Sequence, residues 1–160
     1  MSDLEFTEIL PYNAQDLQQI VMDAHRYTEF TSWIKKVDVT NLGENKKHIA
    51  VLFRVPGIFS DFHYACELDN NPPGKVNAIA VDSPFRSMEG EMTFTTQPDG
   101  GTKVHCVLRY KTGFHPIALI ASAIMHSQLQ RGIDIAKEYL ATRLTRVDAA
   151  PPPAAPAPVI

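Results

Sequence analysis

Apolar residues recur at every second position through most of the stretch between residues 36 and 113. In one run, Val104, Leu108 and Tyr110 alternate with Lys103 and Arg109. Successive strand residues point to opposite faces, so this pattern predicts strands with one dry and one solvated face. Turn-forming Asn, Pro and Gly residues separate the runs and predict an antiparallel meander of about six strands.

Shorter patterns flank this meander. A run at residues 5–9 predicts a first strand, and a helix for which Asn13 is a suitable N-cap follows it. A second short helix is expected at about residues 27–33. After the meander, Pro116 suits a first helical position, and apolar residues then recur at helical spacing as far as Leu144. This spacing predicts a long helix of about 28 residues.

These elements predict an α+β domain over residues 1–146. We expect a curved antiparallel sheet of about seven strands wrapped on the long C-terminal helix, with two short helices after the first strand. A strongly curved sheet on one helix leaves apolar space between them, which is a natural site for a small molecule. Residues 147–160 are rich in Pro and Ala, which favours an extended or disordered tail.

Composition argues against several classes of function. The formal net charge of −3 argues against DNA binding. The chain has two cysteines, too few for a disulfide scaffold or a four-cysteine zinc site. We find no nucleophile motif, phosphate-binding glycine loop or clustered metal ligands, and expect no metal or cofactor.

The acidic first residues are unlike a signal peptide, so we expect a cytoplasmic protein and leave peripheral inner-membrane contact open.

Four strings carry a resemblance: LPYNA at 10–14, YTEF at 27–30 leading to Trp33, SPFR at 83–86 leading to Gly90 and Phe94, and AKEY at 136–139. In this order they resemble the START-like, helix-grip superfamily. Within it, the chain is most similar to coenzyme Q-binding START proteins, ribosome-association toxins and polyketide cyclases. The resemblance implies an isoprenoid quinone such as ubiquinone as the ligand.

The chain departs from that family's usual residues at several positions. Thr28 stands where proline is usual, and Met92 where tryptophan is usual. Gly132 and Ile135 stand where the last helix usually has an aromatic residue and an arginine. The Thr/Ser-Arg pair usual on the third strand is replaced by residues 65–66. The fold implied by the resemblance is therefore better supported than its quinone ligand.

The dry-face aromatic residues have two interpretations, core packing or cavity lining. Buried phenols at Tyr64 and Tyr110 need a partner, which a ligand or the protein itself could provide. Gly132, inside the long helix, indicates either close helix–sheet contact or a cavity enlarged by the missing side chain. The predicted ligand-binding residues are Phe30, Trp33, Val51, Phe53, Phe62, Tyr64, Met92, Phe94, Leu108, Tyr110, Ile124, Gln128 and Gly132.

Three functions remain open, in this order. The first is a non-catalytic carrier or chaperone for a hydrophobic molecule, a quinone, lipid or polyketide. The second is a polyketide aromatase/cyclase, in which Tyr64, Tyr110 or Arg54 would move protons. The third is ribosome association through a basic patch near residues 35–36 or 46–47. The apolar turn at residues 55–59 is either a lid or membrane contact, or packs against the N-terminal helices.

Overall fold

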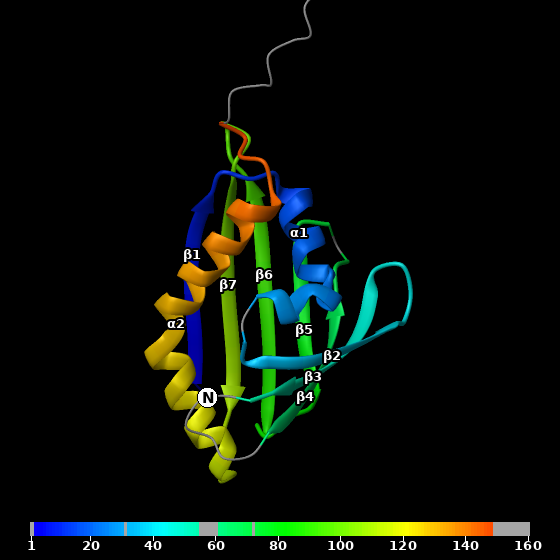
Figure 1. Cartoon of the computed structure of the whole chain (residues 1–160), viewed down its shortest axis with the longest axis vertical. Coiled ribbons are helices and arrows are strands. Elements are labelled where there is room, and N and C mark those ends of the chain that lie inside the picture. The colour runs from blue at the N-terminus through cyan, green and yellow to red at the C-terminus, as the bar shows by residue number, and fades with distance from the viewer. Residues whose placement is uncertain (1, 31, 55–60, 72, 149–160) are drawn as a thin grey trace, which may run out of the picture.

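The computed structural model describes residues 2–30, 32–54, 61–71 and 73–148. Its strands and helices follow the predicted order (Figure 1). They are β1 (Ser2–Leu10), α1 (Ala14–Met22), the 3-10 helix η1 (Ala24–Glu29), β2 (Ile34–Asn41), β3 (Lys46–Phe53), β4 (Phe62–Asp69), β5 (Lys75–Asp82), β6 (Ser87–Thr96), β7 (Thr102–Lys111) and α2 (Pro116–Arg143). The predicted α+β helix-grip fold is confirmed.

The seven strands form one antiparallel sheet in the order β1-β7-β6-β5-β4-β3-β2. Strands β2 to β7 are a meander, because each pairs with the next along the chain, and β1 adds to the far edge beside β7. Helix α2 runs along β1 and β7, whereas α1 and η1 lie over the other half of the sheet (Figure 1). The covered face of the sheet is thus divided between two sets of helices.

Two element boundaries differ from the prediction. Strand β1 spans Ser2–Leu10 rather than residues 5–9, because it pairs with β7 from Ser2 opposite Tyr110 to Leu10 opposite Thr102. The second helix is η1, which ends at Glu29 rather than near residue 33. The carbonyl of Trp33 already accepts a hydrogen bond from the Arg54 amide, at 2.8 Å, so the chain pairs with the end of β3 there.

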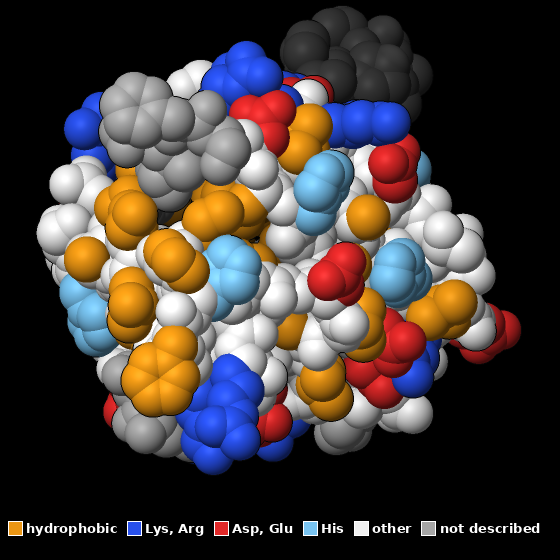
Figure 2. Space-filling model, turned by 90° about the horizontal axis from the view of Figure 1, so that it is seen from below, with side chains coloured by type: hydrophobic (Ala, Val, Ile, Leu, Met, Phe, Trp, Pro, Cys, Tyr) orange, Lys and Arg blue, Asp and Glu red, His pale blue; other side chains and the backbone are white. Residues whose placement is uncertain are grey.

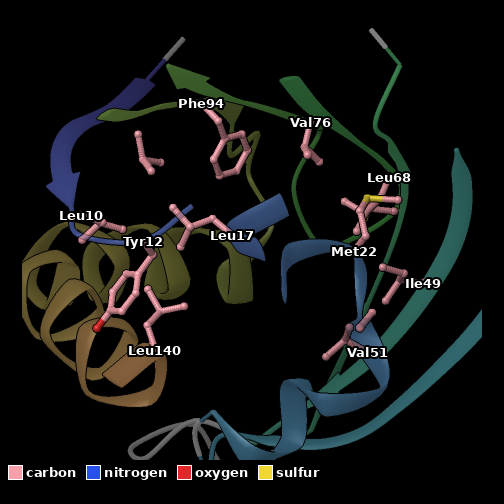
Figure 3. Close-up of a cluster of buried hydrophobic side chains, with 13 residues drawn as sticks. Leu10, Tyr12, Leu17, Met22, Ile49, Val51, Leu68, Val76, Phe94 and Leu140 are labelled. Atoms are coloured by element: carbon pink, nitrogen blue, oxygen red, sulfur yellow. The ribbon is translucent and has the colours of Figure 1, made fainter. Parts of the chain in front are cut away.

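The larger hydrophobic cluster occupies the space between α1, η1 and strands β3 to β5 and extends to side chains of β1, β6, β7 and α2 (Figure 3). Ile49, Val51 and Leu68 contribute from the sheet, and Met22 meets them from α1. Side chains here are close-packed, as protein interiors normally are. Side chains of α1 and η1 therefore cover this half of the sheet.

The predicted cap of α1 is confirmed. The side-chain oxygen of Asn13 accepts a hydrogen bond from the Gln15 amide at 2.8 Å. We expect Asn13→Ala to lower the free energy of unfolding by about 1 kcal/mol, because the first turn then loses its side-chain acceptor. Asn13→Ser keeps an acceptor and is the control. Urea denaturation measures both, and an alanine variant as stable as the serine variant would show that the cap contributes nothing.

The chain stays attached to the domain beyond α2. The Val147 amide donates to the Pro11 carbonyl at 2.8 Å, and Arg146 pairs with Asp148 at 2.8 Å. Residues 149–160 of the expected tail lie outside the described residues, so its extended or disordered state stays a prediction.

Candidate ligand-binding cavity

A cavity of about 460 Å³ lies between α2 and the half of the sheet formed by β1, β7 and β6. The inward side chains of Phe6, Phe94 and Leu108 line it from the strands. Leu17 closes it from α1, and Ile133 faces it from α2. The volume lies within the range of about 300–1,000 Å³ that is usual for small-molecule sites.

Gly132 lies on the wall of this space at an exposed position of α2. Apart from its chain neighbours and the backbone of its own helix, a Cβ atom built on Gly132 would meet no atom within 4 Å. The interpretation of Gly132 as a point of close helix–sheet contact is therefore wrong. The alternative, that the missing side chain enlarges the space beside α2, agrees with the geometry.

Many of the predicted ligand-binding residues line this cavity. They come from the η1–β2 connection, from β6 and β7, and from the middle of α2. They are Phe30, Trp33, Met92, Phe94, Leu108, Ile124, Gln128 and Gly132. Their contact with a ligand stays a prediction, but the structure gathers them around one space.

Other predicted residues lie away from the cavity wall. Val51 is buried in the larger hydrophobic cluster. Phe53 stacks on Phe62, with ring centroids 5.1 Å apart, and meets the edge of Tyr64 at 6.4 Å. These side chains belong to β3 and β4, the half of the sheet that α1 and η1 cover. Strand parity placed them on the dry face, but it could not show which half of that face stays open.

Tyr110 also packs within the protein rather than on the cavity wall. Its side chain is fully buried, and its hydroxyl hydrogen-bonds with Ser122 Oγ at 2.8 Å and His126 Nε2 at 2.7 Å. Phe85 packs edge-on against its ring at 5.4 Å. Of the two partners considered for this phenol, a ligand or the protein, the structure shows the protein. Tyr110 thus ties the first half of α2 to β7.

The remaining proton-transfer candidates of the cyclase hypothesis do not line the cavity either. Burial, followed by the neighbouring Cys66 thiol, raises the pKa of Tyr64. Arg54 is exposed and its Nε lies 2.6 Å from Asp61 Oδ1. Neither side chain is part of the cavity wall.

The sequence interpretation missed part of the lining. Those side chains come from β1, α1, β7 and α2, and they are Leu4, Phe6, Glu8, Leu10, Leu17, Ile20, Val21, Val104, Met125, Leu129, Ile133, Ala136, Lys137 and Leu140. The available signal was Glu8, a carboxylate at an inward position of β1. Lys137 Nζ lies 2.8 Å from Glu8 Oε2, and this hydrogen bond raises the pKa of the lysine.

Side chains of η1 and α2 hold the two elements together beside the cavity. The ring of Phe30 packs against Tyr139, with centroids 5.1 Å apart. Glu29 Oε2 accepts hydrogen bonds from the Tyr139 hydroxyl at 3.1 Å and from Arg143 at 2.7 Å. Two of the strings that carry the resemblance, residues 27–30 and 136–139, therefore meet in space. Their contact fixes Phe30 at the cavity wall.

Comparison of the sequence with known families gives a match over residues 10–135. The matching family is described as polyketide cyclase / dehydrase and lipid transport. The chain belongs to this family. No curated protein matches the sequence.

Several solved structures have the same fold as this chain. The Zhui aromatase/cyclase from Streptomyces sp. R1128 is 12% identical with a TM-score of 0.73, over 93% of this chain and 99% of that chain. A STAR-related lipid transfer protein from Xanthomonas axonopodis is 10% identical with a TM-score of 0.71, over 87% and 85%. A START superfamily protein from Mycobacterium smegmatis is 10% identical with a TM-score of 0.69, over 88% and 97%. At these identities the likeness shows the fold alone.

The two cysteines are separate and shielded. Cys66 lies on β4 and Cys106 on β7, with β5 and β6 between them. Burial raises the pKa of Cys106 to about 11 and also raises the pKa of Cys66. The thiolate is the reactive form of cysteine, so both side chains are poor nucleophiles at neutral pH.

We expect iodoacetamide at pH 8 to label Cys106 about a hundredfold more slowly in the folded protein than an unperturbed thiol of pKa about 8.5. Mass spectrometry of peptides measures the rate, and the same reagent in concentrated urea is the control. Equal labelling rates in the folded and unfolded protein would contradict the burial of this thiol.

The lysines proposed for a ribosome-binding patch are mostly engaged within the protein. Lys36 Nζ lies 3.6 Å from Asp38 and Lys46 Nζ lies 3.2 Å from Glu67. Lys47 Nζ donates to the Met22 carbonyl at 2.8 Å. Lys36 and Lys46 each have a carboxylate nearby, which reduces the charge they offer to a phosphate backbone, whereas the contact of Lys47 with a neutral carbonyl leaves its charge unchanged.

Two general features of the described residues bear on the site. Among them, no three histidine, cysteine or acidic side chains come together as metal ligands would. None of the helices in the described ranges combines the length and apolar character needed to cross a membrane. The turn at residues 55–59, considered as a lid or membrane contact, lies outside the described residues.

Proposed function

We propose that the protein is a carrier or chaperone that holds a hydrophobic small molecule, an isoprenoid quinone or a similar lipid, between α2 and the sheet. The observation that carries this proposal is the 460 Å³ cavity. Its wall is apolar apart from the side chains of Glu8, Gln128 and Lys137 and the indole of Trp33. Such a wall favours an apolar ligand because each buried CH₂ group gains about 0.8 kcal/mol.

The wall offers little for catalysis. Glu8 and Lys137 neutralise each other in their ion pair. The side-chain amide of Gln128 is neither an acid nor a base at neutral pH. A cyclase-type activity is the second candidate, because the family description includes cyclases and a similar fold occurs in an aromatase/cyclase. That activity would have to separate Glu8 from Lys137 to use either as an acid or base.

A carrier must exchange its ligand with a source, and the start of α2 offers a surface for peripheral membrane contact. Hydrophobic side chains gather at the end of the molecule where α2 begins (Figure 2). Phe114 is 99% exposed, and Leu119 and Ile120 are about half exposed. Exposed apolar groups of this kind favour contact with a bilayer.

Trp33 provides a direct test because it is the single tryptophan of the chain and lies on the cavity wall. Quinones quench tryptophan fluorescence at short range. We expect a short-chain ubiquinone analogue to quench Trp33 saturably, with one molecule bound per protein. Free N-acetyl-tryptophanamide is the control for collisional quenching and light absorption by the quinone.

The same titration separates the proposals. If the quenching saturates and a non-quenching lipid restores the fluorescence by displacing the quinone, the result supports a site for hydrophobic ligands in this cavity. Quenching that rises linearly with quinone, as in the control, would contradict quinone binding. If lipids also left the fluorescence unchanged and showed no binding by calorimetry, the carrier function itself would be wrong.

A further inference from the structure

A second cavity of about 370 Å³ adjoins the first. The two share Phe30, Trp33, Gln128 and Gly132 in their walls, so they meet at the gap that Gly132 leaves in α2. The second cavity lies between the η1–β2 connection and the outer side of α2. A ligand held in the apolar cavity could therefore extend one end into this second space.

The second cavity has a different chemical character. Beyond the shared residues, its wall includes Ser32, Arg131 and Ile135. Gln128, Arg131 and Ile135 stand at positions i, i+3 and i+7 of α2, which places their side chains on one face of the helix. Apart from the ion pair of Glu8 and Lys137, the polar side chains are thus concentrated at one end of the two cavities.

Arg131 is an available cation at this end. Its side chain is exposed and, in the part of the chain that the structure describes, forms no ion pair, whereas Lys137 in the first cavity is neutralised by Glu8. The side chains of Ser32 and Gln128 have no hydrogen-bond partner among the described residues. An arginine guanidinium presents a fork of N–H donors that fits carboxylate and phosphate oxygens.

We propose that the bound molecule is an anionic amphiphile whose apolar part fills the first cavity and whose carboxylate or phosphate group binds Arg131. Ser32 and Gln128 are placed to donate further hydrogen bonds to the same group. This inference rests on the proposed function and narrows it, because a neutral quinone has no anion to offer Arg131. Arg131 would then decide which class of ligand the protein prefers, rather than whether a ligand binds.

Three probes with the same ten-carbon chain isolate the head group: decanoate, decyl phosphate and decanol. Calorimetry at pH 7.5 and low salt gives their affinities for the wild-type protein. We expect decanoate or decyl phosphate to bind about tenfold more tightly than decanol, as for a partly exposed hydrogen bond to a charged group. Added salt should weaken binding of the anion but not of the alcohol, because ions screen an exposed charge. The anion whose affinity exceeds that of decanol by the larger factor identifies the head group.

Two variants test the residue. Arg131→Gln removes the charge and should bring the anion to the affinity of decanol, while decanol binding stays unchanged. Arg109→Gln makes the same change on the outer face of β7, where Arg109 is exposed, and should keep the preference.

The remaining outcomes overturn the inference in distinguishable ways. Equal affinity for all three probes, or a preference that survives Arg131→Gln, would leave the carrier function intact and remove the anion site. Equal weakening of decanol and the anions by Arg131→Gln would show that the arginine acts only on the shape of the site. Failure of all three probes to bind would overturn the carrier function as well.

Discussion

Replacing Gly132 with phenylalanine is expected to weaken binding of the hydrophobic ligand by at least about tenfold while leaving the fold intact. The Cβ position is open, so the substitution forces no backbone movement. Gly132 lies on the walls of both cavities, and an aromatic ring there occupies space the ligand needs. Helical glycine costs about 1 kcal/mol relative to alanine, so the variant should be at least as stable as wild type.

The matched control is Gly132→Ala. A methyl group leaves most of the cavity free, so binding should change by no more than about twofold, while helix propensity raises the free energy of unfolding by up to about 1 kcal/mol. Trp33 fluorescence measures binding and thermal unfolding measures stability. If the phenylalanine variant bound as well as the alanine variant, the ligand would lie elsewhere. If both variants were less stable than the wild-type protein, the claim that a side chain at position 132 has free space would be wrong.

Tyr110→Ala is expected to lower the free energy of unfolding by about 3–5 kcal/mol, as for other large aromatic residues deleted from a core. The side chain has no exposed surface, and its removal opens a void beside Phe85. It also removes the hydroxyl that joins β7 to Ser122 and His126 on α2. Phe114→Ala is the control, because a 99% exposed aromatic residue should change stability by less than about 0.5 kcal/mol.

Tyr110→Phe separates the hydroxyl from the ring. We expect a loss of about 1–2 kcal/mol, the usual result of removing a buried hydrogen-bonding partner. Ligand affinity should stay within about twofold of wild type because Tyr110 does not line the cavity. Loss of ligand binding without loss of stability would instead assign Tyr110 to the ligand site.

The fold could be predicted in detail because its elements have strong local signals. Alternation along β7, the Asn13 cap and Pro116 at the start of α2 are each decided by neighbouring residues. The boundaries that differed depend on distant partners. Strand β1 continues to Ser2 because the far end of β7 is available to pair with it.

The site could be predicted only in part, for a physical reason. Parity shows that Phe53 and Phe94 both face the interior, but not that α1 and η1 fill the space before β3 while the space before β6 stays open. That outcome depends on where Met22 and Leu17 place their side chains in the packed domain. The one polar clue, Glu8 on an inward position, gains meaning only once α2 brings Lys137 to it.

The most direct test of the account is native mass spectrometry of the wild-type protein and Gly132→Phe, each incubated with a membrane lipid extract. We predict that the wild-type protein retains one hydrophobic molecule, which organic extraction then identifies, and that the phenylalanine variant retains little or none. The same bound mass on both proteins, or no bound molecule on the wild-type protein, would contradict the claim that this cavity holds a hydrophobic ligand.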